Sequence, residues 1–345
     1  MKFSKKAVLI LLVLALFLQL FSCTPKKIEN PTAKSSVISD AYFDTVSMLY
    51  DYSGLSNEEF YSLCDEVNEL LSVYNKLYDA YSEYSGTNNI MTVNNSAGKG
   101  KVKVDKKIVD LLEYSKEMYE LTNGRINVAM GAVLKLWHEC RYGEREDGER
   151  IPPTDELLYA AQHVDINNLI IDKKNLTVEL TDPEMSLDVG AIGKGYAVEM
   201  IARHLEARGY SSIVLDVGGN LRAIGSKPNG DGWSACVRNP FNPNSQTYVY
   251  KTTVTNESLV TSGSYQRYYT VDGVRYHHII NNETLAPVNY YVSVSIKSPS
   301  SALCDALSTA IFNMPPDEAR EFVKNTTELF VVLVYPDGEI ETLGK

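Results

Sequence analysis

Closely spaced cysteines are missing from this chain. Its 345 residues contain five cysteines, no two of which form a CxxC pair or a metal-ligand spacing. The sequence therefore gives no sign of a cysteine-ligated metal site. Cys64, Cys140, Cys236 and Cys304 either form one or two disulfides in an oxidising compartment or remain as buried free thiols, and the sequence leaves both open.

A hydrophobic run long enough to span a bilayer is also missing. The apolar stretch at residues 7–21 is shorter than the roughly 20 residues that a spanning helix needs. It follows three lysines and ends at Cys23, which is typical of a bacterial lipoprotein signal. We expect residues 1–22 to be a signal peptide and Cys23 to be lipidated. An uncleaved N-terminal anchor is the alternative.

Both interpretations place the rest of the chain outside the cytoplasm. If Cys23 is lipidated, we expect the lipid to anchor the body to the cell membrane, on the outer or periplasmic face. Residues 23–40 are polar and contain proline and serine, so we expect a flexible tether there and one globular body over residues 41–345.

A surplus of positive charge is absent as well. Aspartate and glutamate number 44 against 33 lysines and arginines, which gives a formal net charge of -11. An acidic body repels polyanions, so the composition argues against nucleic acid as a partner.

Neither internal repeats nor low-complexity blocks interrupt the body, and its pattern mixes helices with many short strands. Helical spacing of apolar residues predicts helices over 56–81, 105–124, 196–209 and from 304 onward. Ser56 with Glu59 three residues later has the pattern of a capping box, and Asp105 is the expected start of the second helix. Alternating or β-branched runs predict strands at 45–52, 169–180 (a hairpin), 211–225, 233–239, 247–255, 258–263, 274–280 and 291–298. Such an order indicates an α+β fold with mixed or antiparallel sheets and flanking helices.

A glycine-rich stretch, SLDVGAIGKG at 186–195, precedes one of these helices. It is not a nucleoside-triphosphate P-loop, because Asp188 stands where the first glycine is required and Gly195 follows Lys194. Nor does LDVGGN at 215–220 make a dinucleotide fingerprint. Glycines ahead of a helix still allow a ligand to approach the backbone amides, and Lys194 adds a positive charge. The stretch is either a phosphate-binding loop or an ordinary strand-to-helix turn.

Two further groups of residues carry possible chemistry. Asp305 and Thr309 are four residues apart and so share one face of a helix, where their oxygens suit a hard cation such as Mg²⁺. A capping aspartate and a threonine bonded to its own helix are the structural alternative. His277 and His278 are adjacent in a predicted strand and point to opposite faces, so they cannot bind one ion together. The sequence leaves open whether each histidine has a functional or a structural role.

These pieces, taken in order, resemble the ApbE family of FAD:protein FMN transferases, which are exported flavin-trafficking lipoproteins. The resemblance rests on LDVGAIGKGYAVE, VLDVGGNLRAIG, LVTSGSYQRYYTVDGVRYHHII and DALSTAIF. YSEYSGTNNIMTVN and TNGRINVAMGAVLKLWHECR upstream are similar too, so the likeness runs from about residue 41. It implies one large body with a T-fold-like core.

The resemblance also implies an activity and its residues. The expected reaction is Mg²⁺-dependent transfer of FMN from FAD to a threonine or serine hydroxyl of a partner protein, with release of AMP. The partner would be an electron-transport subunit of the Nqr or Rnf type or an FMN-binding-domain protein. The residues implied for metal are Ala191 (by its carbonyl), Asp305 and Thr309; for FAD, Tyr84, Asn88, Asn89, Asp188, Lys194, His277 and Ile279; and for the base, Asp188 or, as alternatives, His277 or His278.

The chain departs from the family pattern in several places. Asn281 and Asn282 stand where Asp-Pro is usual, and YFDT at 42–45 replaces the usual M-G-T. No departure removes an implied metal ligand. Two other functions remain open at this stage: an FAD pyrophosphatase that releases FMN and AMP, and a flavin-binding lipoprotein without catalysis.

Overall fold

The computed structural model describes residues 31–143 and 150–345. Its largest element is an eight-stranded sheet in which each strand runs antiparallel to its neighbours. From one edge to the other the strands are β1 (Lys34–Ser39), β2 (Ser47–Asp51), β6 (Ser212–Val217), β7 (Asn220–Gly225), β10 (Ser258–Gly263), β13 (Ser293–Ser298), β14 (Phe330–Val334) and β15 (Ile340–Gly344).

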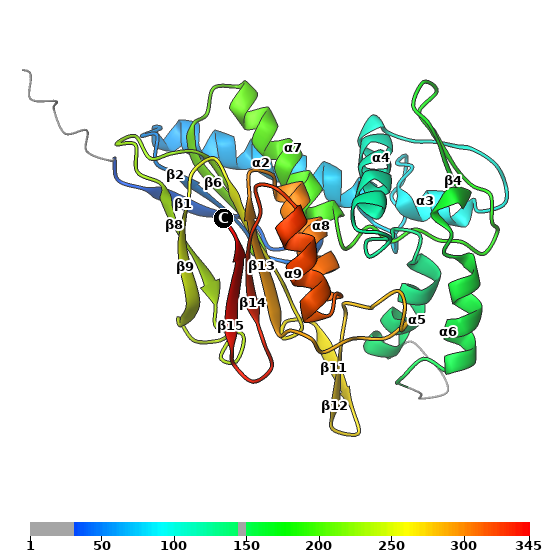
Figure 1. The fold of residues 1–345 in the computed structure, drawn as a ribbon. Helices are drawn as coiled ribbons and strands as arrows, with labels where there is room; N and C mark the ends of the chain where they lie inside the picture. Colours follow the sequence, from blue (N-terminus) through cyan, green and yellow to red (C-terminus); the bar gives the residue numbers. More distant parts are fainter. Residues whose placement is uncertain (1–30, 144–149) are drawn as a thin grey trace, which may run out of the picture.

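Helices cover one face of this sheet, and a two-stranded hairpin covers the other (Figure 1). Alternation along β6 shows the two faces: Leu215 packs in the core beneath the helices, whereas Val214 packs with Trp233 of the hairpin. The sheet is therefore buried on both sides. The helices are α2 (Asn57–Tyr78), α7 (Gly193–Ala207), α8 (Ser301–Phe312) and α9 (Pro316–Asn325), and the hairpin strands are β8 (Trp233–Arg238) and β9 (Tyr248–Val254).

Smaller elements lie beside the sheet, at the right of Figure 1, and a second hairpin projects below it. Trp137 stacks on Tyr276 and so joins a lateral helix to the projecting hairpin. The lateral elements are α3 (Ile90–Asn95), β3 (Val102–Lys103), α4 (Lys106–Leu121), α5 (Gly131–Tyr142), α6 (Thr154–Ala160), β4 (Leu169–Asp172) and β5 (Thr177–Leu180), with short 3₁₀ turns at η1 (Tyr42–Asp44), η2 (Ala161–His163) and η3 (Ile166–Asn168). The projecting hairpin is β11 (Tyr268–Val271) and β12 (Val274–His277).

Local sequence signals explain several element boundaries. Ser56 caps α2, and Glu59 completes the reciprocal capping box expected from the sequence. Asp105 caps α4 in the same way, with its carboxylate accepting from the Lys107 amide. The Asp272-Gly273 pair has positive φ angles of 48° and 81°, as a tight hairpin turn requires. The predicted α+β class with antiparallel sheets is confirmed.

Two predictions about elements are wrong. Residues 34–39 were expected to belong to a tether, but they form β1 and pair antiparallel with β2. An edge strand needs backbone partners rather than an apolar side-chain pattern, so its polar sequence concealed it. Residues 211–225, predicted as one strand, fold back on themselves at Gly218-Gly219 into β6 and β7.

The predicted signal peptide, Cys23 and the first part of the tether lie outside the described residues. Within residues 31–143 and 150–345, no helix is both long and apolar enough to cross a bilayer. The four cysteines in these ranges form no disulfide with one another: Cys64, Cys140 and Cys304 are buried, and Cys236 is half-buried. Among these four cysteines the structure thus favours thiols over disulfides.

Candidate active site

The start of α7 lies directly against α8, and a glycine makes this contact possible. A Cβ atom on Gly195 would lie 2.2 Å from the Cβ of Asp305 and 2.6 Å from the carbonyl oxygen of Ser301. In place of that side chain, the Gly195 amide donates a 2.7 Å hydrogen bond to Oδ2 of Asp305. The glycine loop and the Asp305 helix, which are 110 residues apart in sequence, therefore form one site.

The Ala191 carbonyl lies just before helix α7. The Gly195 amide belongs to the first turn of α7, whose amides have no acceptor within the helix, and it donates to Asp305 instead. Among the hydrogen bonds of the described chain, no backbone amide donates to the Ala191 carbonyl. Asp305 itself is only 6% exposed.

Thr309 follows Asp305 by one helical turn and faces strand β10. Its hydroxyl lies 3.2 Å from the Ser262 hydroxyl, which also bonds Ser308 at 2.8 Å. The structure thus places Asp305 and Thr309 on the part of α8 that contacts the start of α7, two residues after Ala191 in the sequence.

Their donor set fits a hard cation. Carbonyl, carboxylate and hydroxyl oxygens are the ligands that Mg²⁺ prefers, and it commonly uses few protein ligands together with substrate phosphates. Within the described ranges, no three His, Cys, Asp or Glu side chains cluster as a metal site. A cation here would accordingly be held by this mixed set of oxygens.

Lys194 provides the positive charge of the site. Its Nζ lies 3.9 Å from Oδ1 of Asp305, and its side chain is 23% exposed. Burial lowers the pKa of Lys194, while the nearby Asp305 and Asp216 carboxylates oppose that shift. Asp216 is itself affected: burial raises its pKa, against the hydrogen bond that it accepts from the Gly219 amide at 3.0 Å.

Asp188 is held by both of its carboxylate oxygens. Oδ1 accepts from the Gly190 amide at 2.7 Å, and Oδ2 accepts from the Tyr81 hydroxyl at 2.6 Å. Burial and the adjacent Asp188 raise the pKa of Tyr81, so this phenol remains a donor. Tyr81 was missed by the sequence analysis, because nothing in its local pattern distinguishes it from the tyrosines around it.

The two histidines at the end of β12 differ in role. His277 is buried: Nε2 donates to the Val288 carbonyl at 2.9 Å, and Nδ1 accepts from the Ile279 amide at 3.3 Å. Both ring nitrogens are thus engaged within the fold, and the role of His277 as an FAD ligand stays a prediction. The Ile279 amide is engaged in this hydrogen bond to the His277 ring.

His278 keeps one nitrogen available. Its Nδ1 donates to the Arg267 carbonyl at 3.2 Å, which leaves the lone pair of the neutral ring on Nε2. Burial, and after it the Arg267 charge, lowers the pKa of His278 to about 3. The ring is therefore uncharged at neutral pH.

Comparison with known proteins agrees with this geometry. The ApbE family model matches residues 45–333, which is most of the chain. The chain belongs to the ApbE family. A relative from Treponema pallidum named FAD:protein FMN transferase is 31% identical over 304 residues, covering 84% of this chain and 81% of the relative. One of the same name from Escherichia coli K12 is 25% identical over 289 residues, covering 83% and 80%.

Solved ApbE structures share the fold. The ApbE protein of Thermotoga maritima superposes with a TM-score of 0.78 at 25% identity, covering 90% of this chain and 97% of its own. A flavin transferase ApbE from Vibrio cholerae gives 0.75 at 23% identity, with coverage of 90% and 97%. The resemblance to the ApbE family and the single α+β body are thereby confirmed.

The upstream residues predicted for this ApbE-family protein have varied roles. Tyr84 donates to Oδ2 of Asp79 at 2.8 Å, and burial with this carboxylate raises its pKa to about 12. The exposed Asn88 donates to the Lys103 carbonyl at 2.8 Å. Asn89 is fully buried and caps α3, with its amide group donating to the Ser82 carbonyl. The structure gives Asn89 a capping role, and its contact with FAD stays a prediction.

Another upstream residue joins this segment to the glycine loop. Asn94 forms a reciprocal pair with the backbone of Leu187, at 2.9 Å to the carbonyl and 2.7 Å from the amide. Leu187 precedes Asp188, so Asn94 and Tyr81 together fix the loop that carries this carboxylate. A pair of this kind leaves no local sequence signal.

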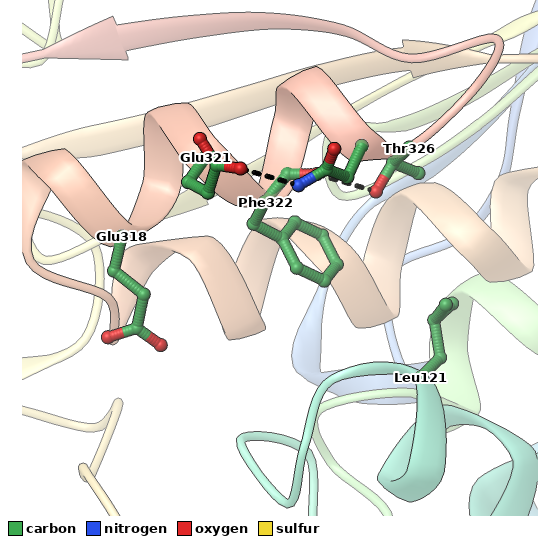
Figure 2. Close-up of a pocket in the computed structure, with 6 residues that line it drawn as sticks. Leu121, Glu318, Glu321, Phe322 and Thr326 are labelled. Carbon is green, nitrogen blue, oxygen red and sulfur yellow. Dashed lines mark hydrogen bonds between the residues drawn. The ribbon is translucent and has the colours of Figure 1, made fainter.

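Two surface hollows lie apart from these residues. One, of about 440 Å³, separates the end of α4 from α9 (Figure 2); its lining residues are Leu121, Glu318, Glu321, Phe322, Asn325 and Thr326. The other, of about 490 Å³, separates α5 from α6 and is lined by Ala132, Leu136, Asp155, Glu156, Tyr159 and Ala160. Neither holds the charge pattern of the Asp305 region, so we assign the chemistry to that region.

Proposed function

We infer that this ApbE-family protein transfers FMN from FAD to a threonine or serine hydroxyl of an acceptor protein and releases AMP. The relatives named FAD:protein FMN transferase support this reaction. The observation that supports it most is the junction of Gly195 with Asp305, where the Lys194 ammonium lies 3.9 Å from the Asp305 carboxylate.

The first task of the site is to bind a diphosphate. Helix α7 begins at Gly193, and the positive end of its dipole together with the Lys194 ammonium attracts anions. Ala191, Asp305 and Thr309 would hold Mg²⁺, which when bound supplies charge neutralisation and polarises phosphoryl oxygens. Asp188, fixed by Tyr81 and Gly190, orients the loop that presents these groups.

The second task is to accept a proton from the attacking hydroxyl. Oxygen of the acceptor forms a bond to the FMN phosphorus while the phosphoanhydride bond breaks, and the electron pair leaves with AMP. We assign the proton to Nε2 of His278, since both oxygens of Asp188 already accept hydrogen bonds.

Covalent labelling tests this proposal. The purified protein is mixed with FAD, Mg²⁺ and an acceptor carrying a D-G-x-[TS]-G-A-[TS]-like segment, and flavin fluorescence is read in a denaturing gel. Asp305→Ala is expected to lower labelling by about 100-fold or more, because it removes the charged donor of the site. Asp110→Ala is the matched control, since Asp110 lies on the surface of α4 and pairs only with Lys106.

The same reaction separates the alternatives. A pyrophosphatase would release AMP at full rate without acceptor and leave no fluorescent band. A flavin-binding protein without catalysis would leave FAD intact. Either result from the unaltered protein contradicts the transferase proposal.

A further inference from the structure

Glu199 is a buried acid of α7 to which no role has been given. The residue is only 3% exposed and lies one helical turn after Gly195. Its Oε2 accepts a 2.9 Å hydrogen bond from the backbone amide of Ser301, the first residue of α8. That amide belongs to the first turn of α8, whose amides have no acceptor within the helix. Glu199 therefore holds the beginning of the helix that carries Asp305.

This bond and the bond between Gly195 and Asp305 are matched in spacing. On α7 the two contacts are four residues apart, at Gly195 and Glu199, and on α8 they are also four residues apart. The later residue of α7 bonds the earlier residue of α8, so both bonds form together in only one alignment of the helices. A shift of α8 by one residue would move its atoms about 1.5 Å along the axis and about 100° around it. The two bonds therefore fix the register of α8 on α7.

The carboxylate of Glu199 is itself fixed by two arginines. Oε1 accepts from Nε of Arg203 at 2.8 Å, and Oε2 lies 3.5 Å from Nε of Arg222. Arg222 belongs to strand β7, its side chain is 4% exposed, and its Nη2 donates to Glu206 at 2.8 Å. A buried charge is tolerated when it is paired and hydrogen-bonded, and these partners meet that condition. Glu199 thus links α8 to the sheet as well as to α7.

The side of α8 that is held in this way also carries the proposed cation ligands. Ser301, Asp305 and Thr309 follow one another at intervals of four residues, so they lie along one side of the helix. The middle residue bonds Gly195, and the last lies 3.2 Å from the Ser262 hydroxyl. A displacement of α8 at its first residue would accordingly move both ligand side chains.

We propose that Glu199 is a positioning residue of the cation site. Its carboxylate is engaged by α8, Arg203 and Arg222, so it acts on the cation through α8, by setting where the Asp305 and Thr309 oxygens lie. The inference rests on the Mg²⁺ site of the proposed function and extends it by one residue. Replacing a residue that orients metal ligands in this way typically changes metal affinity about 10- to 100-fold.

Binding of Mn²⁺, which stands in for Mg²⁺, tests the inference on the purified full chain without acceptor or nucleotide. Glu199→Ala is expected to raise the Mn²⁺ dissociation constant about 10-fold or more, measured from the electron paramagnetic resonance of free Mn²⁺. Glu199→Gln keeps an oxygen that can accept from Ser301 and should lose less affinity than Glu199→Ala. An unchanged constant in Glu199→Ala, or equal losses in the two variants, would overturn the proposal.

Leu205→Ala is the control for general loss of stability. Leu205 is fully buried near the end of α7 that lies away from Gly195, so its truncation leaves a cavity and lowers the unfolding temperature. Positioning by Glu199 predicts that Leu205→Ala binds Mn²⁺ as tightly as the unaltered protein. A loss equal to that of Glu199→Ala would identify destabilisation as the cause and would refute the proposal.

A second substitution removes the same bond from its other side. Ser301→Pro deletes the amide that donates to Glu199, at the first position of a helix, where proline is favoured. It is expected to weaken Mn²⁺ binding, and the double variant Glu199→Ala with Ser301→Pro is expected to bind no more weakly than Glu199→Ala alone. Additive losses would show that the two residues act separately and would contradict the register argument.

The same titrations separate this inference from the proposed function. If the unaltered protein binds no Mn²⁺, or if Asp305→Ala binds it equally well, the cation site is refuted and this inference with it. If Mn²⁺ binds through Asp305 but independently of Glu199, only the positioning role is refuted.

Discussion

At the scale of residues, hydrogen bonds rather than sequence pattern assign the roles. Asp188 and His278 were both candidates for the base, and His277 was an alternative. The structure engages both oxygens of Asp188 and both nitrogens of His277, and leaves Nε2 of His278 as an acceptor. Sequence shows which side chains can carry a proton, but only the partners of each atom show which one is free to do so.

The shifted pKa of His278 predicts how stability depends on pH. The pKa is about 3 in the folded protein, against an ordinary value near 6.5, so the unfolded chain binds a proton that the folded chain does not. This residue's contribution is complete above pH 6.5 and is lost as the pH falls toward 3. Between pH 7 and 5 it costs about 2 kcal/mol.

Denaturant unfolding at pH 7 and pH 5 measures this effect. His278→Gln is expected to reduce the acid loss of unfolding free energy by about that 2 kcal/mol. His204→Gln is the control, because His204 lies on the surface of α7 beside Glu66. An unchanged pH dependence in His278→Gln would show that the histidine is not held neutral in the fold.

At the scale of elements, local signals such as helix caps could be read from the sequence, whereas contacts between separate segments could not. Capping residues Ser56 and Asp105 predicted where α2 and α4 begin, because a cap is a local interaction. Strand β1 was missed because it pairs with β2 through backbone hydrogen bonds, which leave no pattern in its side chains. A left-handed turn at Phe43 and Asp44 could not be predicted either, because the Arg267 side chain that donates to its carbonyls lies more than 200 residues away.

The junction of α7 with α8 gives a prediction at this scale. Gly195→Ala would force a methyl group to 2.2 Å from Asp305 and is expected to destabilise the fold by about 1–3 kcal/mol and abolish labelling. Gly193→Ala is the matched control, because a Cβ there meets its nearest neighbours, Tyr78 and Val189, at 3.4 Å. Gly195→Ala should therefore unfold at a lower temperature and label less acceptor than Gly193→Ala. Equal unfolding temperatures and equal labelling in the two variants would contradict the packing argument.

At the scale of the whole molecule, the site is formed where two helices that are distant in sequence, α7 and α8, come together. The sequence predicted that Ala191, Asp305 and Thr309 act together only through resemblance to a family, because spacing along the chain cannot show that α8 crosses the start of α7. The Gly195 amide supplies the missing physical link, since its bond to Asp305 joins the two elements. Figure 1 shows these two helices packed together on the sheet, with the α3–α6 region beside them.

The most direct test of the convergent oxygen site is the Mg²⁺ dependence of FMN transfer. Acceptor labelling is measured at fixed FAD over a series of free Mg²⁺ concentrations, with the unaltered protein and Asp305→Asn, which keeps the shape of the side chain and removes its charge. The account predicts no labelling in chelator, saturation with Mg²⁺ in the unaltered protein, and at least a tenfold higher requirement in Asp305→Asn. Labelling that persists in chelator, or an identical Mg²⁺ requirement in both proteins, would contradict it.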